Sequence, residues 1–360
     1  MKVRLPVRKA ILQRKTYETP AEDRLNKLRL DFNENTSGCG PAVLRALRKL
    51  TPQQVAMYPE YAASTRRIAA YFGIAEHELL LTNGGDDALR VFFDAFVEPS
   101  SRVLICEPTF PMYRYYAEIA GARIETLRYG SEMEFPLDEF VSALRKKTAV
   151  VFIANPNNPT GTLLPPAAIQ KILLAATSTV VVIDEAYAEF SGVTVLPWIR
   201  KYPNLFVTRT FSKAAGLAGL RLGAAMACRE SIALLRRAMP PFPVNVAALA
   251  AAEAAVQERR AIRKYVQQTR EIREWFVGKL VRLGVRTFPS AGNFLLADFG
   301  VQGPALLKKL ASQGILVRER SKDIGPGFVR ISIGTGSEMK RLVKVIQKEI
   351  VGPRFRRERN

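Results

Sequence analysis

The sequence has a single histidine and only three cysteines, which excludes several kinds of chemistry. His77 lies between two glutamates in a segment typical of an exposed helix start. We therefore expect no His-based nucleophile triad and no metal site. Cys39, Cys106 and Cys228 lie far apart and show neither redox nor metal-ligand spacing. We interpret them as small apolar side chains in a reducing compartment.

Acidic residues and long apolar runs are also scarce. The 360 residues include 54 Lys and Arg against 33 Asp and Glu, a formal net charge of +21. No apolar run approaches the ~20 residues that a membrane-spanning helix needs, so we expect no membrane association. The basic N-terminus contains no continuous apolar segment of the secretory type, and its lack of serine disfavours a transit peptide. We expect a cytoplasmic protein.

The excess of positive charge has two interpretations. It can attract nucleic acid, or it can belong to a solvated surface that also draws in small anionic substrates. The basic residues are scattered along the chain, and no zinc-finger spacing, RNA-binding signature or repeat accompanies them. We favour the second interpretation and expect no nucleic-acid partner.

Short β-branched apolar runs alternate with helical patterns through the middle of the chain. This alternation predicts an α/β fold with a mostly parallel sheet between helices. The predicted strands are Leu79–Thr82, Arg102–Cys106, Arg123–Tyr129, Ala149–Asn155, Thr179–Asp184, Leu205–Thr210 and Leu222–Cys228. The predicted helices between them include Asp86–Val97, Pro111–Ala120 and Pro166–Ala175.

A long amphipathic pattern predicts a helix from Arg260 to Leu283, which Gly284 ends. The shorter β runs and two helices that follow predict a smaller α+β domain. Residues before about 50 are too irregular to place by periodicity. We predict three parts: an N-terminal arm with part of the small domain (1–50), a large ligand-binding domain (51–259), and the linking helix with the C-terminal small domain (260–360). The strands predicted for the small domain are Val285–Pro289, Phe294–Phe299, Ile315–Arg318 and Phe328–Ile333, and its helices lie near Pro304–Ser312 and Ser337–Val351.

Ligands of open α/β sheets bind beyond the carboxyl ends of the strands, where two motifs stand out. Asp184 directly follows four apolar strand residues, so we expect it to be partly buried and to need a cation or several donors. Taken alone, it is more simply a helix N-cap. The turn Asn155–Gly161 is fixed by two prolines and a glycine and can aim amide donors into the crevice.

Lys213 is the only charge among small and apolar residues. Desolvation would lower its pKa and make it a better amine nucleophile toward carbonyls. Thr210, Ser212 and Arg221 add two hydroxyls and a forked cation, which suit a phosphate dianion. The glycine turn 82–88 opens a helix whose free N–H groups form an anion site, although its acids are also ordinary first-turn residues.

A reactive lysine, a phosphate cradle and a buried carboxylate match the aldehyde, phosphate and pyridinium nitrogen of pyridoxal phosphate. From about Leu30 to Ile346 the chain resembles fold-type I aminotransferases, most closely the histidinol-phosphate aminotransferase branch. The motifs that carry the resemblance are Gly84-Gly-Asp-Asp87, Asn157-Asn-Pro-Thr-Gly161, Asp184-Glu-Ala-Tyr187, Phe211-Ser-Lys213 and Ala218-Gly-Leu-Arg-Leu-Gly223.

The resemblance implies a role for each matching residue. Lys213 would bind the cofactor's aldehyde and carry a proton to and from the substrate's Cα. Asp184 would pair with the pyridinium nitrogen, and Asn158 and Tyr187 would bind the phenolic oxygen. Phe110 would stack on the cofactor ring. The phosphate would be held by Gly85, Asp86, Thr210, Ser212 and Arg221, and by Tyr58 from the neighbouring subunit, which implies a homodimer with shared active sites.

The same comparison implies a set of substrate anchors. Arg330 would take a carboxylate, which guanidinium binds bidentately. Arg318 would assist when the anion is a phosphate, although the nearby Arg320 and Lys322 are also typical of a charged surface run. Tyr17 would reach the substrate phosphate from the N-terminal arm.

The implied reaction converts L-histidinol phosphate and 2-oxoglutarate to imidazole acetol phosphate and L-glutamate, a step of histidine biosynthesis. The alternatives with the same fold are an aromatic amino-acid aminotransferase and a threonine-phosphate decarboxylase. A different class of alternative is a basic nucleic-acid-binding protein on an inactive aminotransferase scaffold. The segment Asn33–Pro41 lacks the proline and aromatic residue that frequently follow Asn-Glu-Asn in this branch, which leaves the side-chain specificity open.

Overall fold

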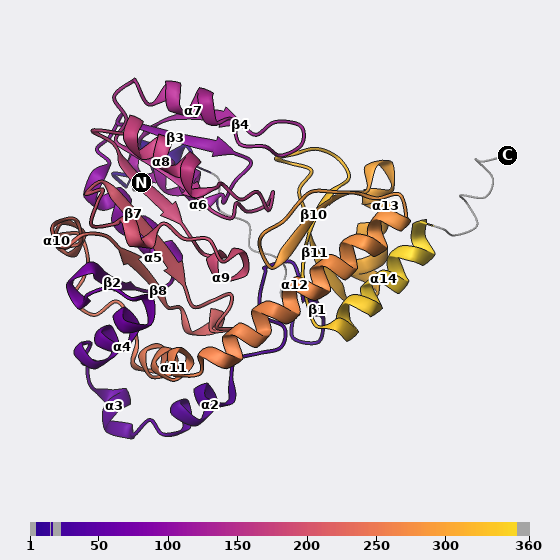
Figure 1. Cartoon of the computed structure of the whole chain (residues 1–360), viewed down its shortest axis with the longest axis horizontal. Coiled ribbons are helices and arrows are strands. Elements are labelled where there is room, and N and C mark those ends of the chain that lie inside the picture. Colours follow the sequence, from indigo (N-terminus) through magenta and orange to yellow (C-terminus); the bar gives the residue numbers. More distant parts are fainter. Residues whose placement is uncertain (1–4, 15, 17–22, 351–360) are drawn as a thin grey trace.

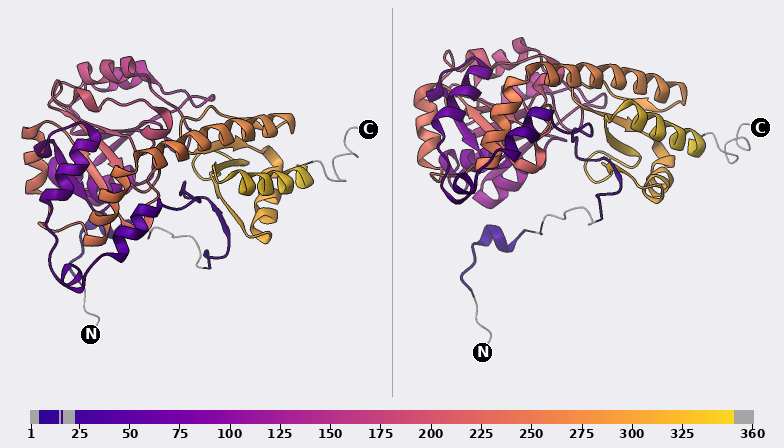
Figure 2. Two further views of the ribbon diagram at one scale, coloured as in Figure 1. Left: turned by 60° about the horizontal axis from the view of Figure 1, so that its bottom comes forward. Right: turned by 90° about the horizontal axis from the view of Figure 1, so that it is seen from below.

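The computed structural model describes residues 5–14, 16 and 23–350, which form two sheets with their helices. The long helix α12 (Arg259–Arg282) runs from the large sheet to the small one (Figure 1). Two further views show the small sheet and its helices at one end of the molecule (Figure 2). Among the described residues, no helix has the length and apolar character needed to cross a membrane.

The large sheet has seven strands in the order β2-β8-β7-β6-β5-β3-β4. β8 runs opposite to the other six strands, which are parallel to one another, and this confirms the predicted mostly parallel sheet. Every strand coincides with a predicted one to within two residues at each end. The strands are β2 (Leu79–Thr82), β3 (Arg102–Glu107), β4 (Arg123–Arg128), β5 (Val150–Ala154), β6 (Val180–Asp184), β7 (Leu205–Thr210) and β8 (Gly223–Met226).

Helices cover both faces of the large sheet, so the central strands are apolar on both sides. In β5, Val151 and Ile153 join one hydrophobic cluster, while Val150 and Phe152 join another across the sheet. The first cluster includes residues of α4 (Ala62–Phe72), α7 (Leu137–Ala143), α8 (Pro166–Ala175) and α11 (Val246–Gln257). The second includes residues of α5 (Gly85–Phe96), α6 (Met112–Ala120) and α10 (Arg229–Arg237).

The small sheet has five strands in the order β1-β11-β12-β10-β9. Its edge strand β1 comes from the N-terminal segment and pairs in parallel with β11. Periodicity did not place β1, because three residues are too few to show a repeat. The elements are β1 (Leu28–Leu30), β9 (Arg286–Thr287), β10 (Phe294–Asp298), β11 (Ile315–Glu319), β12 (Phe328–Ser332), α13 (Gly303–Ser312) and α14 (Gly336–Ile350). The domain boundaries given above stay a prediction.

The helix α12 shows the predicted amphipathic pattern. Val266, Phe276 and Leu280 are buried, and the last two belong to the core of the small sheet. Gly284 follows with φ +75°, a conformation that glycine adopts readily at a helix end. The remaining helices are α1 (Lys9–Leu12), α2 (Pro41–Arg48), α3 (Pro52–Ala56), α9 (Ala188–Ser191) and the 3-10 turns Glu76–Glu78, Leu196–Trp198, Ala218–Leu220 and Gly300–Gln302.

Candidate active site

A cavity of about 650 Å³ is lined by residues of both sheets. It lies where β5, β6 and β7 end, as expected for an open α/β sheet. Most of the residues that the sequence singled out line it together. They are Gly85, Asp86, Phe110, Asn158, Asp184, Tyr187, Thr210, Ser212, Lys213, Arg221, Arg318 and Arg330.

Asp184, at the end of β6, is held by three donors. The Tyr113 hydroxyl donates to Oδ2 at 2.8 Å, while the Thr208 hydroxyl and the Ala186 N–H donate to Oδ1 at 3.0 and 3.1 Å. Burial raises the pKa of Asp184, and the three hydrogen bonds act in the opposite direction. A carboxylate in this position is stabilised further by a cation.

Two of these partners were missed by sequence reasoning. Thr208 lies on β7 directly beside Asp184 in the parallel register, and Tyr113 lies on α6 with its side chain fully buried. The order of the strands in the sheet brings Thr208 to the carboxylate. No local pattern in the sequence reveals that order.

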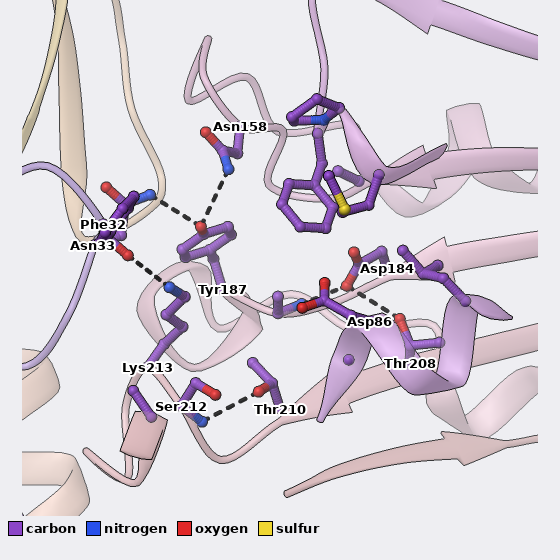
Figure 3. Close-up of a pocket in the computed structure, with 18 of the residues that line it drawn as sticks. Phe32, Asn33, Asp86, Asn158, Asp184, Tyr187, Thr208, Thr210, Ser212 and Lys213 are labelled. Carbon is purple, nitrogen blue, oxygen red and sulfur yellow. Dashed lines mark hydrogen bonds between the residues drawn. The ribbon is translucent and has the colours of Figure 1, made fainter. Parts of the chain in front are cut away.

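Lys213 lies in the loop after β7 and points toward the N-terminal segment (Figure 3). Its Nζ donates to the Phe32 carbonyl oxygen at 2.7 Å. Burial, and next the positive charge of Arg330, lower the pKa of Lys213 from 10.5 to about 8. The predicted lowering of this pKa is confirmed, and the amine is therefore a stronger nucleophile near neutral pH than an exposed lysine.

The N-terminus of α5 forms one end of the cavity. The glycines Gly84 and Gly223 allow the two chain segments to meet there, because a Cβ on Gly223 would lie 2.5 Å from the Gly84 carbonyl carbon. Arg221 donates from Nη2 to Asp86 at 3.2 Å. Free N–H groups at the start of a 12-residue helix, beside a guanidinium, suit a phosphate group.

Two hydroxyls border the same end of the cavity. Thr210 Oγ1 accepts a hydrogen bond from the Ser212 N–H at 3.1 Å, which fixes the turn after β7. Both residues line the cavity beside Arg221. The residues predicted to hold a phosphate therefore lie together at this end of the cavity.

Tyr187 lies between two amide side chains (Figure 3). Its hydroxyl oxygen accepts from Asn33 Nδ2 at 2.9 Å and from Asn158 Nδ2 at 3.4 Å. Asn33 comes from the segment that follows β1, and it was not among the predicted site residues. Phe110 lines the cavity with its ring edge-on to Tyr113, at 5.7 Å between centroids. Its ring is placed to offer an apolar surface to a planar ligand.

Three arginines reach the cavity from the small sheet. Arg318 and Arg330 are register partners on β11 and β12, so their side chains leave the same face of the sheet. Arg320, two residues further along the chain, also lines the cavity and is only 8% exposed. It pairs with Asp323. The interpretation of Arg320 as part of an exposed charged run is therefore wrong.

Arg330 is buried without an acidic partner. Its guanidinium donates to Asn158 Oδ1 and to the Asp31 carbonyl oxygen, and within residues 23–350 no carboxylate pairs with it. Burial, and to a smaller extent the charges of Arg320 and Arg318, lower the pKa of Arg330 from 12.5 to about 10. A cation in this position attracts an anionic ligand.

Of the predicted site residues, one does not line the cavity and another lies outside the described residues. Tyr58 is 79% exposed and stacks on the half-exposed Phe242, at 4.5 Å between ring centroids. It does not line the cavity of its own chain, so any contact with this cavity would have to involve a second chain. Tyr17 lies outside the described residues.

The chemistry of the lining suits pyridoxal phosphate. The anion site at α5, the Asp184 carboxylate and the Lys213 amine occupy one cavity, and the close approach of Gly84 and Gly223 leaves the helix N-terminus accessible. Each group has a complement on the cofactor: a phosphate, a ring nitrogen and an aldehyde. The cavity volume is in the range of cofactor sites.

Comparisons with known proteins agree with this geometry. Residues 26–346 match the family model "Aminotransferase class I and II". The chain is 36% identical to a histidinol-phosphate aminotransferase of Geobacillus sp. (strain WCH70), with 89% of each chain covered. It is 33% identical to histidinol-phosphate aminotransferase 1 of Pseudomonas fluorescens, with 91% of this chain and 94% of that protein covered.

A solved structure shares the fold as well. The histidinol-phosphate aminotransferase of Sinorhizobium meliloti in complex with pyridoxal-5'-phosphate superposes with a TM-score of 0.84 at 26% identity, with 90% of this chain and 91% of that chain covered. The family match covers nearly the whole chain and includes every cavity residue named above. The chain belongs to the class I and II aminotransferase family.

Proposed function

We propose that this protein is a pyridoxal-phosphate-dependent aminotransferase that transfers the amino group of L-histidinol phosphate to 2-oxoglutarate. The observation that carries the proposal is the set of three small-sheet arginines that face the same cavity as Lys213. An amine that carries a phosphomonoester has a phosphate for the arginines and an amino group for the Lys213 end of the cavity. The names of the relatives in Geobacillus and Pseudomonas support the same substrate.

The large sheet supplies the residues for the cofactor. When bound, pyridoxal phosphate supplies an aldehyde and a ring that accepts electrons from the substrate's Cα. Asp184 would pair with the ring nitrogen, and Asn158 and Tyr187 would bind the phenolic oxygen. Phe110 would cover one face of the ring. The residues proposed to hold the phosphate are Gly85, Asp86, Thr210, Ser212 and Arg221.

Lys213 is proposed as the group that moves the proton at Cα. A lysine whose pKa is about 8 exists partly as the neutral amine near physiological pH, so it can accept a proton and return it. Its contact with the Phe32 carbonyl holds the amine beside the substrate end of the cavity.

Arg330 and Arg318 are proposed to bind two different anions in turn. The planar guanidinium matches a carboxylate and a phosphate equally well, in each case through parallel N–H donors. One anion pocket can therefore accept the phosphate of the amino donor and a carboxylate of 2-oxoglutarate. This alternation is what a transamination between the two substrates requires.

A homodimer with shared active sites forms part of the proposal. Tyr58 lies on the surface with other exposed apolar side chains, which are Val55, Met57 and Phe242. A second copy would cover these residues and bring Tyr58 to the phosphate end of the neighbouring cavity. Sedimentation of the wild type and of Tyr58→Asp tests this: we expect a dimer of the first and weaker association of the second. A monomeric wild type would contradict it.

A cytoplasmic location stays a prediction from composition.

The substrate is tested by incubating the cofactor-loaded protein with 2-oxoglutarate and one amine at a time. The four amines are histidinol phosphate, phenylalanine, threonine phosphate and, as a reference, aspartate, and the readouts are glutamate formed and carbon dioxide released. We expect histidinol phosphate to give glutamate fastest. Faster reaction of phenylalanine would indicate an aromatic aminotransferase, and carbon dioxide from threonine phosphate would indicate a decarboxylase.

The non-enzyme alternative has its own outcome. No reaction with any amine, together with sequence-selective binding of nucleic acid that survives moderate salt, would support a basic nucleic-acid-binding protein. Binding to a polyanion that disappears at moderate salt would reflect only the net charge of +21.

A further inference from the structure

Asn33 is a buried polar residue of the cavity wall to which the proposed reaction gives no role. It lies in the segment after β1 and is only 1% exposed. Its backbone has φ +55°, a left-handed conformation that asparagine adopts more readily than most residues other than glycine. Such conformations persist where the surrounding structure fixes them, and they are frequent at functional sites. A buried asparagine in this conformation needs partners for both its backbone and its amide.

Ser332 on β12 orients the amide of Asn33. Its Oγ accepts from the Asn33 backbone N–H at 2.8 Å and donates to Oδ1 of Asn33 at 3.0 Å. The Asn33 carbonyl oxygen accepts from Nδ2 of Asn293 at 3.0 Å. Because Oδ1 is used in this way, Nδ2 is the end of the amide that faces Tyr187, and it donates to the hydroxyl oxygen at 2.9 Å (Figure 3). Asn33 is thus a donor toward Tyr187.

The Tyr187 hydroxyl oxygen receives a second amide donor, Nδ2 of Asn158, at 3.4 Å. In the hydrogen bonds among the described residues this hydroxyl only accepts, so its own proton has no acceptor there. Tyr187 lines the cavity, so the proton is left for a ligand. Burial raises the pKa of Tyr187, while the charge of Arg330 and the hydrogen bond from Asn33 lower it. A donor on the oxygen thus makes the O–H a stronger donor in turn.

The two residues before Asn33 also contact groups of the cavity, but in a different way. The Asp31 carbonyl oxygen accepts from Arg330, and the Phe32 carbonyl oxygen accepts from Lys213. Both contacts use the backbone, so any side chain at these positions could allow them. Asn33 makes its contact through the side chain. It is therefore the residue of this segment whose identity matters for the hydrogen bond to Tyr187.

We propose that Asn33 is a positioning residue for the cofactor: by donating to the oxygen of Tyr187, it leaves the Tyr187 proton for the phenolic oxygen of pyridoxal phosphate. The inference rests on the role of Tyr187 in the proposed function and adds the group that directs its proton. Asn33 acts through Tyr187 and not on the cofactor itself. With the amide turned the other way, Tyr187 would donate to Oδ1 of Asn33, and its proton would no longer reach the cofactor.

A pH titration of the visible absorption band of the cofactor-loaded protein tests this without any substrate. In the loaded protein, the Tyr187 proton and the proton on the Lys213 nitrogen compete for the same phenolic oxygen. A weaker Tyr187 donor therefore lets the nitrogen keep its proton to higher pH. Asn33→Gly suits the left-handed backbone and removes the amide. We expect it to raise the midpoint of the titration by roughly 0.5 to 1 pH unit, the effect of one hydrogen bond.

A double-mutant cycle shows whether the effect passes through Tyr187. Tyr187→Phe should raise the midpoint at least as much as Asn33→Gly, and adding Asn33→Gly to it should change little, because the hydroxyl is gone. Ser332→Ala keeps Asn33 but removes the hydrogen bond that orients its amide, so it should give a smaller rise. Thr36→Val is the matched control: it breaks the contact of the same segment with Glu338, 2.6 Å long, and should leave the midpoint unchanged.

Four results would overturn the role of Asn33: an unchanged or lower midpoint in Asn33→Gly, shifts that add in full with those of Tyr187→Phe, or an equal rise in Thr36→Val. A lower midpoint would mean that Tyr187 donates to Asn33 in the wild type. If Asn33→Gly does not bind the cofactor, an unchanged midpoint in Ser332→Ala overturns the role instead. In each case the proposed function stands if the wild type shows the visible band and turns over histidinol phosphate. A wild type without the band would contradict the proposed function itself.

Discussion

The two walls of the cavity are built in different ways. On the large-sheet side, functional groups sit at the ends of adjacent strands, and Asp184 and Thr208 are neighbours in the register of β6 and β7. On the small-sheet side, the wall combines β11 and β12 with the segment after β1, about 280 residues earlier in the chain. The first wall is fixed by a sheet ladder, whereas the second depends on how distant segments pack.

Direct hydrogen bonds join the two walls. Arg330 donates to Asn158, Lys213 donates to the Phe32 carbonyl, and Asn33 donates to Tyr187. Each pair has one member on the large-sheet side and one on the small-sheet side. The two walls carry different groups, so substitutions in them should have different effects. Substitutions in the large-sheet wall should abolish the chemistry, while substitutions in the small-sheet wall should mainly change the affinity for substrates.

The largest effect is expected on the large-sheet side from Lys213→Ala. The change removes both the amine that binds the cofactor and the group that moves the proton, so turnover should fall by at least about 10³-fold. Because no acidic residue in the described part of the chain pairs with the buried lysine, we expect the melting temperature to stay within a few degrees of the wild type. Lys201→Ala, at an exposed position, is the control. Retained turnover would contradict the role of Lys213.

On the small-sheet side, Arg330→Lys should change affinity more than rate. A lysine keeps the charge but loses the planar fork, so KM for histidinol phosphate and for 2-oxoglutarate should both rise, by roughly 10-fold or more. Steady-state kinetics in both substrates measures this, with the exposed Arg128→Lys as the matched control. An unchanged KM for both substrates would show that Arg330 is not the common anion anchor and would remove the contrast between the walls.

The same contrast explains what could be predicted from the sequence. Contiguous motifs gave Asp184, Asn158, Lys213 and Arg221, because each motif lies at one strand end or one turn. The seven strands of the large sheet followed from their apolar runs, which burial on both faces requires. The parallel pairing and the helices on both faces followed from the alternation of strand and helix.

Other features depend on contacts between distant segments. Tyr113 and Thr208 become partners of Asp184 only through the strand order, and Asn33 reaches Tyr187 only because β1 joins the small sheet. Arg320 looked exposed in the sequence, yet the packing of β11 against β12 buries it. A single sequence contains no local signal for such contacts, so these residues had to be found in the structure.

The pH dependence of cofactor attachment sharpens the assignment on the large-sheet side. Only the neutral amine attacks an aldehyde, and a pKa of about 8 means that roughly a tenth of Lys213 is neutral at pH 7. The rate constant for attachment of pyridoxal phosphate to the cofactor-free protein should rise about tenfold from pH 7 to 9 and then level off. Stopped-flow absorbance measures it, and the rate with Nα-acetyl-lysine in the same buffers, divided by that amine's own neutral fraction, corrects for titration of the cofactor. A rate that still climbs steeply above pH 9.5 would mean that the pKa is not lowered.

The smallest effect is expected from Tyr113→Phe, which removes one donor to Asp184 and keeps the buried ring. One hydrogen bond to a carboxylate of this kind should be worth a factor of about 2 to 10 in kcat/KM. Burial already raises the pKa of Asp184, and loss of the donor would raise it further, so the acid limb of the pH–rate profile should move to higher pH. Thr208→Val removes the donor to the other oxygen and should give a shift of the same sign. A loss of thermal stability in both variants without any shift of the acid limb would assign Tyr113 and Thr208 to packing alone, and the large-sheet wall would then lack the electrostatic tuning that distinguishes it from the small-sheet side.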